Sequence, residues 1–194
     1  AGGEHDNWAD FDETMERVTA RIRVGNIYVN RNIIGAVVGV QPFGGHGLSG
    51  TGPKAGGPLY MRRLLRARPL AAFPQGAEPK PNLTAERLKQ WLASKERYVE
   101  ASRVVSQIAA SPMGYRRELP GPVGEENHYA VVPRGKILAI AATEAGLLTQ
   151  LGAIFATGNS AVVIAQAAHR DILATLPASL AVRIELADDW RQVS

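Results

Sequence analysis

Residues 136–164 read KILAIAATEAGLLTQLGAIFATGNSAVVI, a stretch in which short β-branched runs flank a longer apolar run. A short run bounded by turn residues is typical of a buried strand, whereas a longer run is typical of a helix. With the residues that follow it, this stretch predicts a strand over 136–142, a helix over 147–157, a strand over 161–164, a helix over 169–176 and a strand over 182–186. Because strands and helices alternate, the order favours a parallel α/β sheet.

Upstream of this region the sequence predicts one further strand, one long helix and a linker. The strand covers residues 129–132, and the helix begins at Thr84 and is bounded by Pro112. Residues 71–81, AAFPQGAEPKP, hold three prolines and few bulky residues, as linkers do. The sequence is accordingly divided into three consecutive parts, residues 1–70, the linker 71–81, and residues 82–194.

The first part is dominated by glycine-rich residues 35–58, GAVVGVQPFGGHGLSGTGPKAGGP. A helix is predicted to begin at Asp10 and end near Gly25, followed by a strand over residues 26–30. A glycine-rich stretch of this length is uncommon unless it builds a site, because glycines let the backbone approach a ligand and expose N–H groups. Composition leaves two interpretations of it open, a binding loop and a set of tight turns at a subunit edge.

Composition excludes several classes of protein. The chain has 194 residues, 45% of them hydrophobic and 21% charged, which excludes a disordered or fibrous protein. The absence of cysteine excludes disulfides and thiolate metal sites in this chain. The net charge of +4 permits nucleic-acid binding without indicating it, and no apolar run is as long as a membrane span requires. Ala1 in place of Met and an end just after a strand predict a piece of a longer protein, with a processed domain as the alternative.

Other candidate residues have ordinary structural explanations. The histidines lack metal-ligand spacing, and the acidic groups at 10–13 and 188–189 fit helix caps and solvated ends. The arginines of residues 62–68 favour a solvated face or a subunit contact over phosphate binding. Ser49 lacks the flanking pattern of a nucleophile elbow.

Residues 24–58, VGNIYVNRNIIGAVVGVQPFGGHGLSGTGPKAGGP, resemble the end of the aldehyde dehydrogenase catalytic domain. PFGG followed by SG is general to aldehyde dehydrogenases. The longer motif NRNIIGAVVGVQPFGG with GTGPKAGGP is similar to L-glutamate γ-semialdehyde dehydrogenases, above all to the bifunctional proline utilization A family. Residues 119–164 are similar to the extra C-terminal domain of its longer members, which is Rossmann-like and itself aldehyde-dehydrogenase-like. Residues 1–10 depart from the family pattern.

The resemblance assigns substrate-binding roles to three residues of the glycine-rich stretch. Gly35 and Ala36 match the backbone positions that anchor the α-carboxylate and amino group of the substrate, and Phe43 matches the aromatic residue that packs on its aliphatic part. Backbone amides without bulky side chains can hold a carboxylate, and a ring can exclude water from the aldehyde. Asn30 is expected to order this loop.

The resemblance also implies what this chain lacks. The family's nucleophile is a cysteine, so no catalytic residue is expected here, and neither a cofactor-binding nor a metal-binding residue is expected. Residues 142–145, ATEA, stand where aldehyde dehydrogenases have a Trp-Asn-Phe-Pro segment. Ile164 and Ala165 stand where a lysine usually binds the NAD ribose, and apolar side chains cannot donate to hydroxyls. The second part is therefore expected to cover the first or to support assembly.

As a whole, the resemblance implies a piece of an enzyme that oxidises proline to glutamate. The intact parent would use NAD and FAD, neither of which this segment would bind alone, and its substrate here would be L-glutamate γ-semialdehyde. The remainder of the parent would be a partner of this segment in a homo-oligomer. The parent would be cytoplasmic, or peripheral to the inner membrane through its flavin domain, with no nucleic acid bound by this segment. The alternative is a non-enzymatic docking or oligomerisation module.

Overall fold

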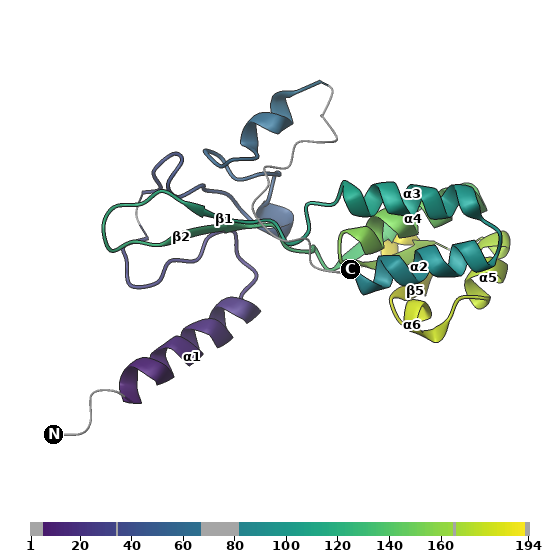
Figure 1. The fold of residues 1–194 in the computed structure, drawn as a ribbon, viewed down its shortest axis with the longest axis horizontal. Coiled ribbons are helices and arrows are strands. Elements are labelled where there is room, and N and C mark those ends of the chain that lie inside the picture. The colour runs from purple at the N-terminus through teal and green to yellow at the C-terminus, as the bar shows by residue number, and fades with distance from the viewer. Residues whose placement is uncertain (1–5, 34, 67–81, 165, 193–194) are drawn as a thin grey trace. The chain divides into compact units, whose positions relative to one another are not determined.

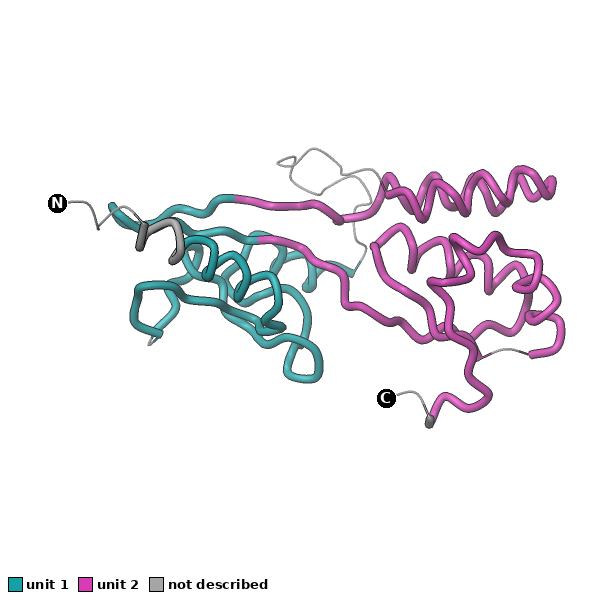
Figure 2. The backbone as a smooth tube through the Cα atoms, turned by 90° about the horizontal axis from the view of Figure 1, so that it is seen from below, with its two compact units in different colours: residues 1–68, 118–129 teal, residues 69–117, 130–194 magenta. Residues whose placement is uncertain are grey.

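The computed structural model describes residues 6–33, 35–66, 82–164 and 166–192, and its chain forms two compact units (Figure 2). Unit 1 comprises residues 1–68 and 118–129, and unit 2 comprises residues 69–117 and 130–194. The sequence-based linker over 71–81 lies outside the described residues. In the sequence, residues 69–117 of unit 2 lie between the two segments of unit 1.

Unit 2 is built on a three-stranded parallel sheet, which confirms the predicted α/β class. Its strands β3 (Lys136–Ala139), β4 (Ser160–Ile164) and β5 (Ile184–Ala187) are ordered β3-β4-β5. Ile137 pairs with Ala161, which pairs in turn with Ile184. Helix α4 (Glu144–Ala156) connects β3 to β4, and Thr143 caps it by accepting a hydrogen bond from the Gly146 N–H at 3.1 Å.

The single helix predicted between Thr84 and Pro112 is wrong, because the structure has two helices there, α2 (Leu83–Ser94) and α3 (Tyr98–Ala109). The chain reverses at Glu96, whose φ is 59°, and the Arg97 N–H donates to the Leu92 carbonyl at 2.9 Å. The cap of α2 is Asn82 rather than Thr84, since the Asn82 Oδ1 accepts from the Ala85 N–H at 3.1 Å. The two helices pack against each other (Figure 1).

The core of unit 2 is almost entirely aliphatic. Side chains from α2, α3, α4 and one face of the sheet form it, and the short helices α5 (Ala167–Ala174) and α6 (Ala178–Ala181) complete it. The largest fully buried side chains in it are Phe155, Leu88, Leu92, Leu147, Leu148, Leu151 and Leu180. A 3-10 turn, η3 (Trp190–Gln192), follows β5.

Unit 1 has little regular structure. Helix α1 (Asp6–Arg21) begins at Asp6 rather than at Asp10, and two 3-10 helices follow, η1 (Gly47–Ser49) and η2 (Tyr60–Leu64). The strand predicted over residues 26–30 is wrong, because these residues join no sheet in the structure. Extended β-branched residues become a strand only where a neighbouring strand supplies backbone partners.

The last part of unit 1, residues 118–129, includes the end of β1 (Arg116–Leu119) and most of β2 (Asn127–Ala130) in a two-stranded sheet. This sheet pairs β1, which sequence analysis did not predict, with β2. The turn between these strands belongs to unit 1. Among the described residues, every helix is too short or too polar to cross a membrane.

Candidate functional site

The glycine-rich stretch folds back on itself, and apart from the short 3-10 helix η1 its described residues form neither a helix nor a strand of a sheet. Phe43 and Ala55 make an isolated antiparallel bridge, in which each N–H donates to the other residue's carbonyl, at 3.0 Å and 2.9 Å. The Gly39 N–H donates to the Gly56 carbonyl at 3.0 Å. The turn after Gly35 and the segment around Phe43 are therefore both held on residues 55–56.

Asn26 fixes the segment around Phe43 from outside the stretch. Its Nδ2 donates to the Pro42 carbonyl at 2.7 Å, and its Oδ1 accepts from the Gly44 N–H at 3.2 Å. The Asn26 side-chain amide thus provides hydrogen-bond partners for one carbonyl and one N–H group of a backbone segment that lies outside any sheet. Asn30, which was expected to order the loop, is exposed and has a φ of 53°, so this role falls to Asn26.

Lys54 supports the same segment from within the stretch. Its Nζ donates to the Gly44 carbonyl at 3.0 Å and also to the Gly45 carbonyl. Partial burial lowers the pKa of Lys54, because the charged form loses water. A Cβ on Gly44 would lie 2.9 Å from the Lys54 Cδ, so glycine at this position makes room for the lysine.

The three predicted substrate-binding residues, Gly35, Ala36 and Phe43, are exposed to solvent. Gly35 has a φ of 80°, and a Cβ there would meet no atom within 4 Å. Ala36 is exposed, and Phe43 as a residue is 59% exposed although its backbone is fixed on both sides. One loop thus carries both an exposed aromatic residue and a short backbone stretch, Gly35–Ala36, with no side chain larger than a methyl group.

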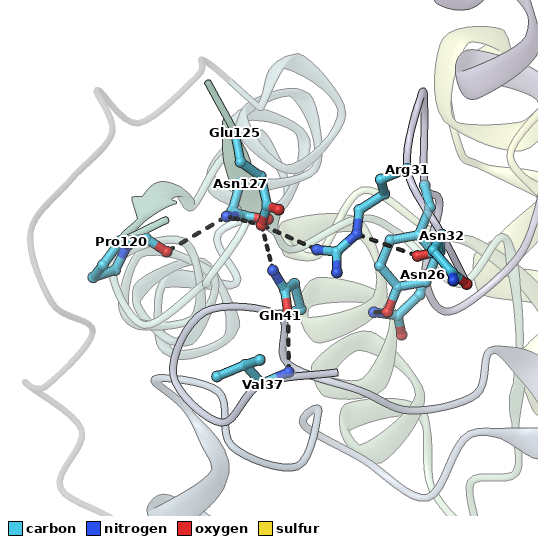
Figure 3. Close-up of polar contacts among 9 residues, drawn as sticks. Asn26, Arg31, Asn32, Val37, Gln41, Pro120, Glu125 and Asn127 are labelled. Atoms are coloured by element: carbon cyan, nitrogen blue, oxygen red, sulfur yellow. Dashed lines mark hydrogen bonds and ion pairs between the residues drawn. The ribbon is translucent and has the colours of Figure 1, made fainter. Parts of the chain in front are cut away.

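A polar cluster that sequence analysis missed contacts the backbone of the turn after Ala36, at Val37 (Figure 3). The Glu125 Oε1 accepts from Arg31 Nη1 at 3.0 Å, from Asn127 Nδ2 at 2.9 Å, and from Gln41 Nε2. The Gln41 Oε1 accepts in turn from the Val37 N–H at 3.0 Å. Glu125 and Gln41 are separated by 84 positions in sequence, and no local pattern indicates that they meet.

Charge and hydrogen bonding favour the ionised form of Glu125. The hydrogen bond from Asn127 is the largest cause that lowers its pKa, followed by the hydrogen bond from Gln41 and the positive charge of Arg31, while desolvation opposes them. Arg31 is itself held by Tyr28, whose ring centre lies 5.4 Å from the guanidinium carbon. The carboxylate is therefore a fixed acceptor at neutral pH.

The other candidate residues have structural partners. The Ser49 Oγ donates to the His46 carbonyl at 2.9 Å within η1, and Arg63 donates to the Thr51 carbonyl. Among the residues that the structure describes, no group of histidines and carboxylates could hold a metal ion. In unit 2, Thr143 serves as a helix cap and Ile164 ends β4, while Ala165 lies outside the described residues.

Comparison with known proteins found a family match within the first 69 residues of the chain. Residues 8–69 match the model of the aldehyde dehydrogenase family. This range includes the whole glycine-rich stretch and the residues Asn26 and Arg31 that brace it. Over 54 residues the chain is 50% identical to a 1-pyrroline-5-carboxylate dehydrogenase of Bacillus subtilis, a match that covers 28% of this chain and 10% of that enzyme.

Two longer relatives match nearly the whole chain. It is 48% identical over 180 residues to the bifunctional protein PutA of Rhizobium meliloti and 44% identical over 190 residues to that of Escherichia coli. These matches cover 93% and 91% of this chain, which spans 14% of the length of either relative. Residues 8–69 thus match the aldehyde dehydrogenase family model, within a sequence that is similar over nine-tenths of its length to bifunctional PutA proteins.

Proposed function

We propose that this chain is part of a bifunctional enzyme of proline catabolism and that its glycine-rich loop anchors L-glutamate γ-semialdehyde. The semialdehyde is the open-chain form of 1-pyrroline-5-carboxylate, the compound for which one of the similar dehydrogenases is named. The observation that carries this proposal is the loop itself, in which Asn26 and Lys54 fix the backbone while Gly35, Ala36 and Phe43 stay exposed.

The loop suits a substrate with one charged end and one aliphatic chain. Backbone N–H groups at Gly35 and Ala36 would bind the α-carboxylate, since these two residues themselves carry no side chain larger than a methyl group. The ring of Phe43 would cover the methylene groups and keep water from the aldehyde carbon. The fixed backbone would let binding proceed without ordering the loop, which saves conformational entropy.

Chemistry on the aldehyde would require residues outside this chain. The nucleophilic cysteine expected of an aldehyde dehydrogenase is absent here, so the 194 residues alone would be inactive. NAD would accept the hydride in the intact enzyme, and FAD would serve a separate proline-oxidising site. Unit 2 would not bind NAD, because the Ile164 side chain at the end of β4 has no hydrogen-bond donor for a ribose.

Unit 2 would act as a covering or assembly domain in a cytoplasmic homo-oligomer. Its Rossmann-like character is part of this proposal. It rests on the parallel order β3-β4-β5 and on α4 as the connection between the first two strands.

Replacement of Phe43 tests the proposed function. In the intact enzyme, Phe43→Ala should lower kcat/KM for the semialdehyde about ten-fold to a hundred-fold, or about 1.4–3 kcal/mol, chiefly through a raised KM. Leu48→Ala is the matched control, because Leu48 is fully exposed in the same loop, and it should leave kcat/KM unchanged. Steady-state kinetics with purified variants measures both, and an unaltered kcat/KM in Phe43→Ala would refute a substrate-wall role.

A further inference from the structure

Glu125 is presented to the glycine-rich loop by a turn with well-defined internal contacts. The Glu125 N–H donates to the Pro122 carbonyl at 3.1 Å, and Gly124 adopts a φ of 85°. The Asn127 side chain ties the turn together, since its Nδ2 donates both to the Pro120 carbonyl and to the Glu125 carboxylate. The position of the carboxylate is therefore set by the turn and not by a freely rotating side chain on an open surface.

Besides Asn127 in its own turn, the Glu125 carboxylate accepts hydrogen bonds from two residues, Arg31 and Gln41. Arg31 precedes Gly35, and Gln41 follows Ala36, so the two contacts flank the proposed anchor. Gln41 is only 6% exposed, and Glu125 and Arg31 keep 22% and 27% of their side-chain surface. A buried amide donor left without its acceptor is costly, which makes Gln41 dependent on Glu125.

Gln41 transmits this contact to the anchor backbone. The Gln41 Oε1 accepts from the Val37 N–H at 3.0 Å. The backbone N–H of Gln41 donates to the Val37 carbonyl at 2.8 Å. Val37 is the residue directly after Ala36. The hydrogen bonds thus run from the Glu125 carboxylate through the Gln41 amide to the peptide next to the proposed carboxylate site (Figure 3).

We propose that Glu125 is a positioning residue for the anchor: its carboxylate holds Arg31 and Gln41, and through Gln41 it fixes the backbone on which Gly35 and Ala36 bind the substrate carboxylate. This inference rests on the proposed function. It makes the turn between β1 and β2 a working part of the substrate site, although that turn lies outside residues 8–69, which match the family model.

The adjacent Glu126 supplies a matched control. Its side chain keeps 70% of its surface and pairs with His128 instead of with the loop. Removing either carboxylate changes the net charge by the same amount at nearly the same place. Only removal of Glu125 takes the acceptor away from Arg31 and Gln41.

The first measurement is amide hydrogen exchange at Val37, made on the intact protein that contains this chain. Glu125→Ala should speed exchange at Val37 about ten-fold, because Gln41 loses the partner that holds it. Glu125→Gln keeps an acceptor oxygen and should give a smaller increase, and Glu126→Ala should give none. Equal exchange at Val37 in Glu125→Ala and Glu126→Ala would overturn the inference whether or not the protein is an enzyme.

The second measurement compares two aldehydes in the same variants. Glu125→Ala should raise KM for L-glutamate γ-semialdehyde about ten-fold with little change in kcat, and should leave KM for propanal, which has no carboxylate, unchanged. A KM for the semialdehyde that stays unchanged, or rises equally for both aldehydes, would overturn the positioning role. A wild-type enzyme that oxidises propanal but not the semialdehyde would instead refute the proposed function, and Val37 exchange would still decide whether Glu125 orders the loop.

Discussion

In unit 2 the core consists of leucine, valine, isoleucine and alanine side chains with Phe155 and Trp91, and these come from neighbouring helices and strands. In unit 1 the buried residues among those described are Leu59, Leu119, Pro42 and the polar Gln41. Unit 1 is held instead by side-chain amides and charges that bind backbone groups, as Asn26 and Lys54 do. The first kind of unit obtains its stability from apolar area, whereas the second obtains a defined backbone shape from specific polar contacts.

This difference teaches how a rigid loop can remain exposed. An anchor for a small charged molecule has to leave backbone groups accessible, so it cannot be stabilised by burying them in a core. Side-chain hydrogen bonds from Asn26, Lys54 and Gln41 fix the backbone of the loop. Gly35, Ala36 and Phe43 take no part in these side-chain contacts and stay exposed.

A cavity in unit 2 should have the largest effect on stability. Phe155→Ala should lower the free energy of unfolding by about 3–5 kcal/mol, because the ring is fully buried among leucines. Val182→Ala, at an exposed position of the same unit, should change it by less than about 0.5 kcal/mol. Chemical denaturation measures both, and similar values for the two variants would contradict the picture of an apolar core.

Removal of the Asn26 amide should have a smaller and local effect. Asn26→Ala leaves the Pro42 carbonyl and the Gly44 N–H without their partner, which costs about 1–3 kcal/mol. Amide exchange at Gly44 should rise while exchange in α4 of unit 2 stays the same. Asn30→Gly, which keeps the positive φ of that residue, should leave Gly44 unaffected. If Asn30→Gly had the larger effect, Asn26 would not be the brace.

Acidification should loosen the contact between Glu125 and the loop. Hydrogen bonds from Asn127 and Gln41 and the charge of Arg31 lower the pKa of Glu125 in the folded protein. The stabilisation is therefore fully present above the ordinary glutamate pKa and is lost as pH falls through the lowered folded value. The ratio of Val37 exchange in Glu125→Gln to that in the wild type should fall toward one at low pH. A ratio that grows on acidification would contradict this sign.

Addition of NAD to the 194-residue chain should have no effect. Ile164 ends β4 at the position where the family resemblance expects a ribose-binding lysine, and an apolar side chain cannot donate to ribose hydroxyls. Isothermal calorimetry with NAD should show only heat of dilution. A saturable titration would contradict the proposal that unit 2 serves only for covering or assembly.

The fold of unit 2 was largely predictable because its signals are local. The apolar run of α4 predicts a helix and the β-branched residues of β4 predict a strand, without reference to any distant residue. The division between α2 and α3 was not predictable in this way. Lys95, Glu96 and Arg97 are ordinary helix residues, and the chain reverses there because the two helices pack against each other.

The candidate site was predictable only in part, for the opposite reason. The glycine-rich motif pointed to residues 35–58, but the contacts that shape the loop join residues far apart in sequence. No pattern around Glu125 or Gln41 distinguishes them from other polar residues. The strand expected over residues 26–30 failed because the stretch has β propensity but no partner strand in the structure.

Replacement of Ala36 tests the central claim, that this loop binds the substrate carboxylate, most directly. In the intact enzyme, Ala36→Leu should block the backbone N–H groups and lower kcat/KM for L-glutamate γ-semialdehyde about ten-fold or more, while kcat/KM for propanal stays within about two-fold of the wild type. The same fractional loss for both aldehydes, or no loss for the semialdehyde, would contradict the claim.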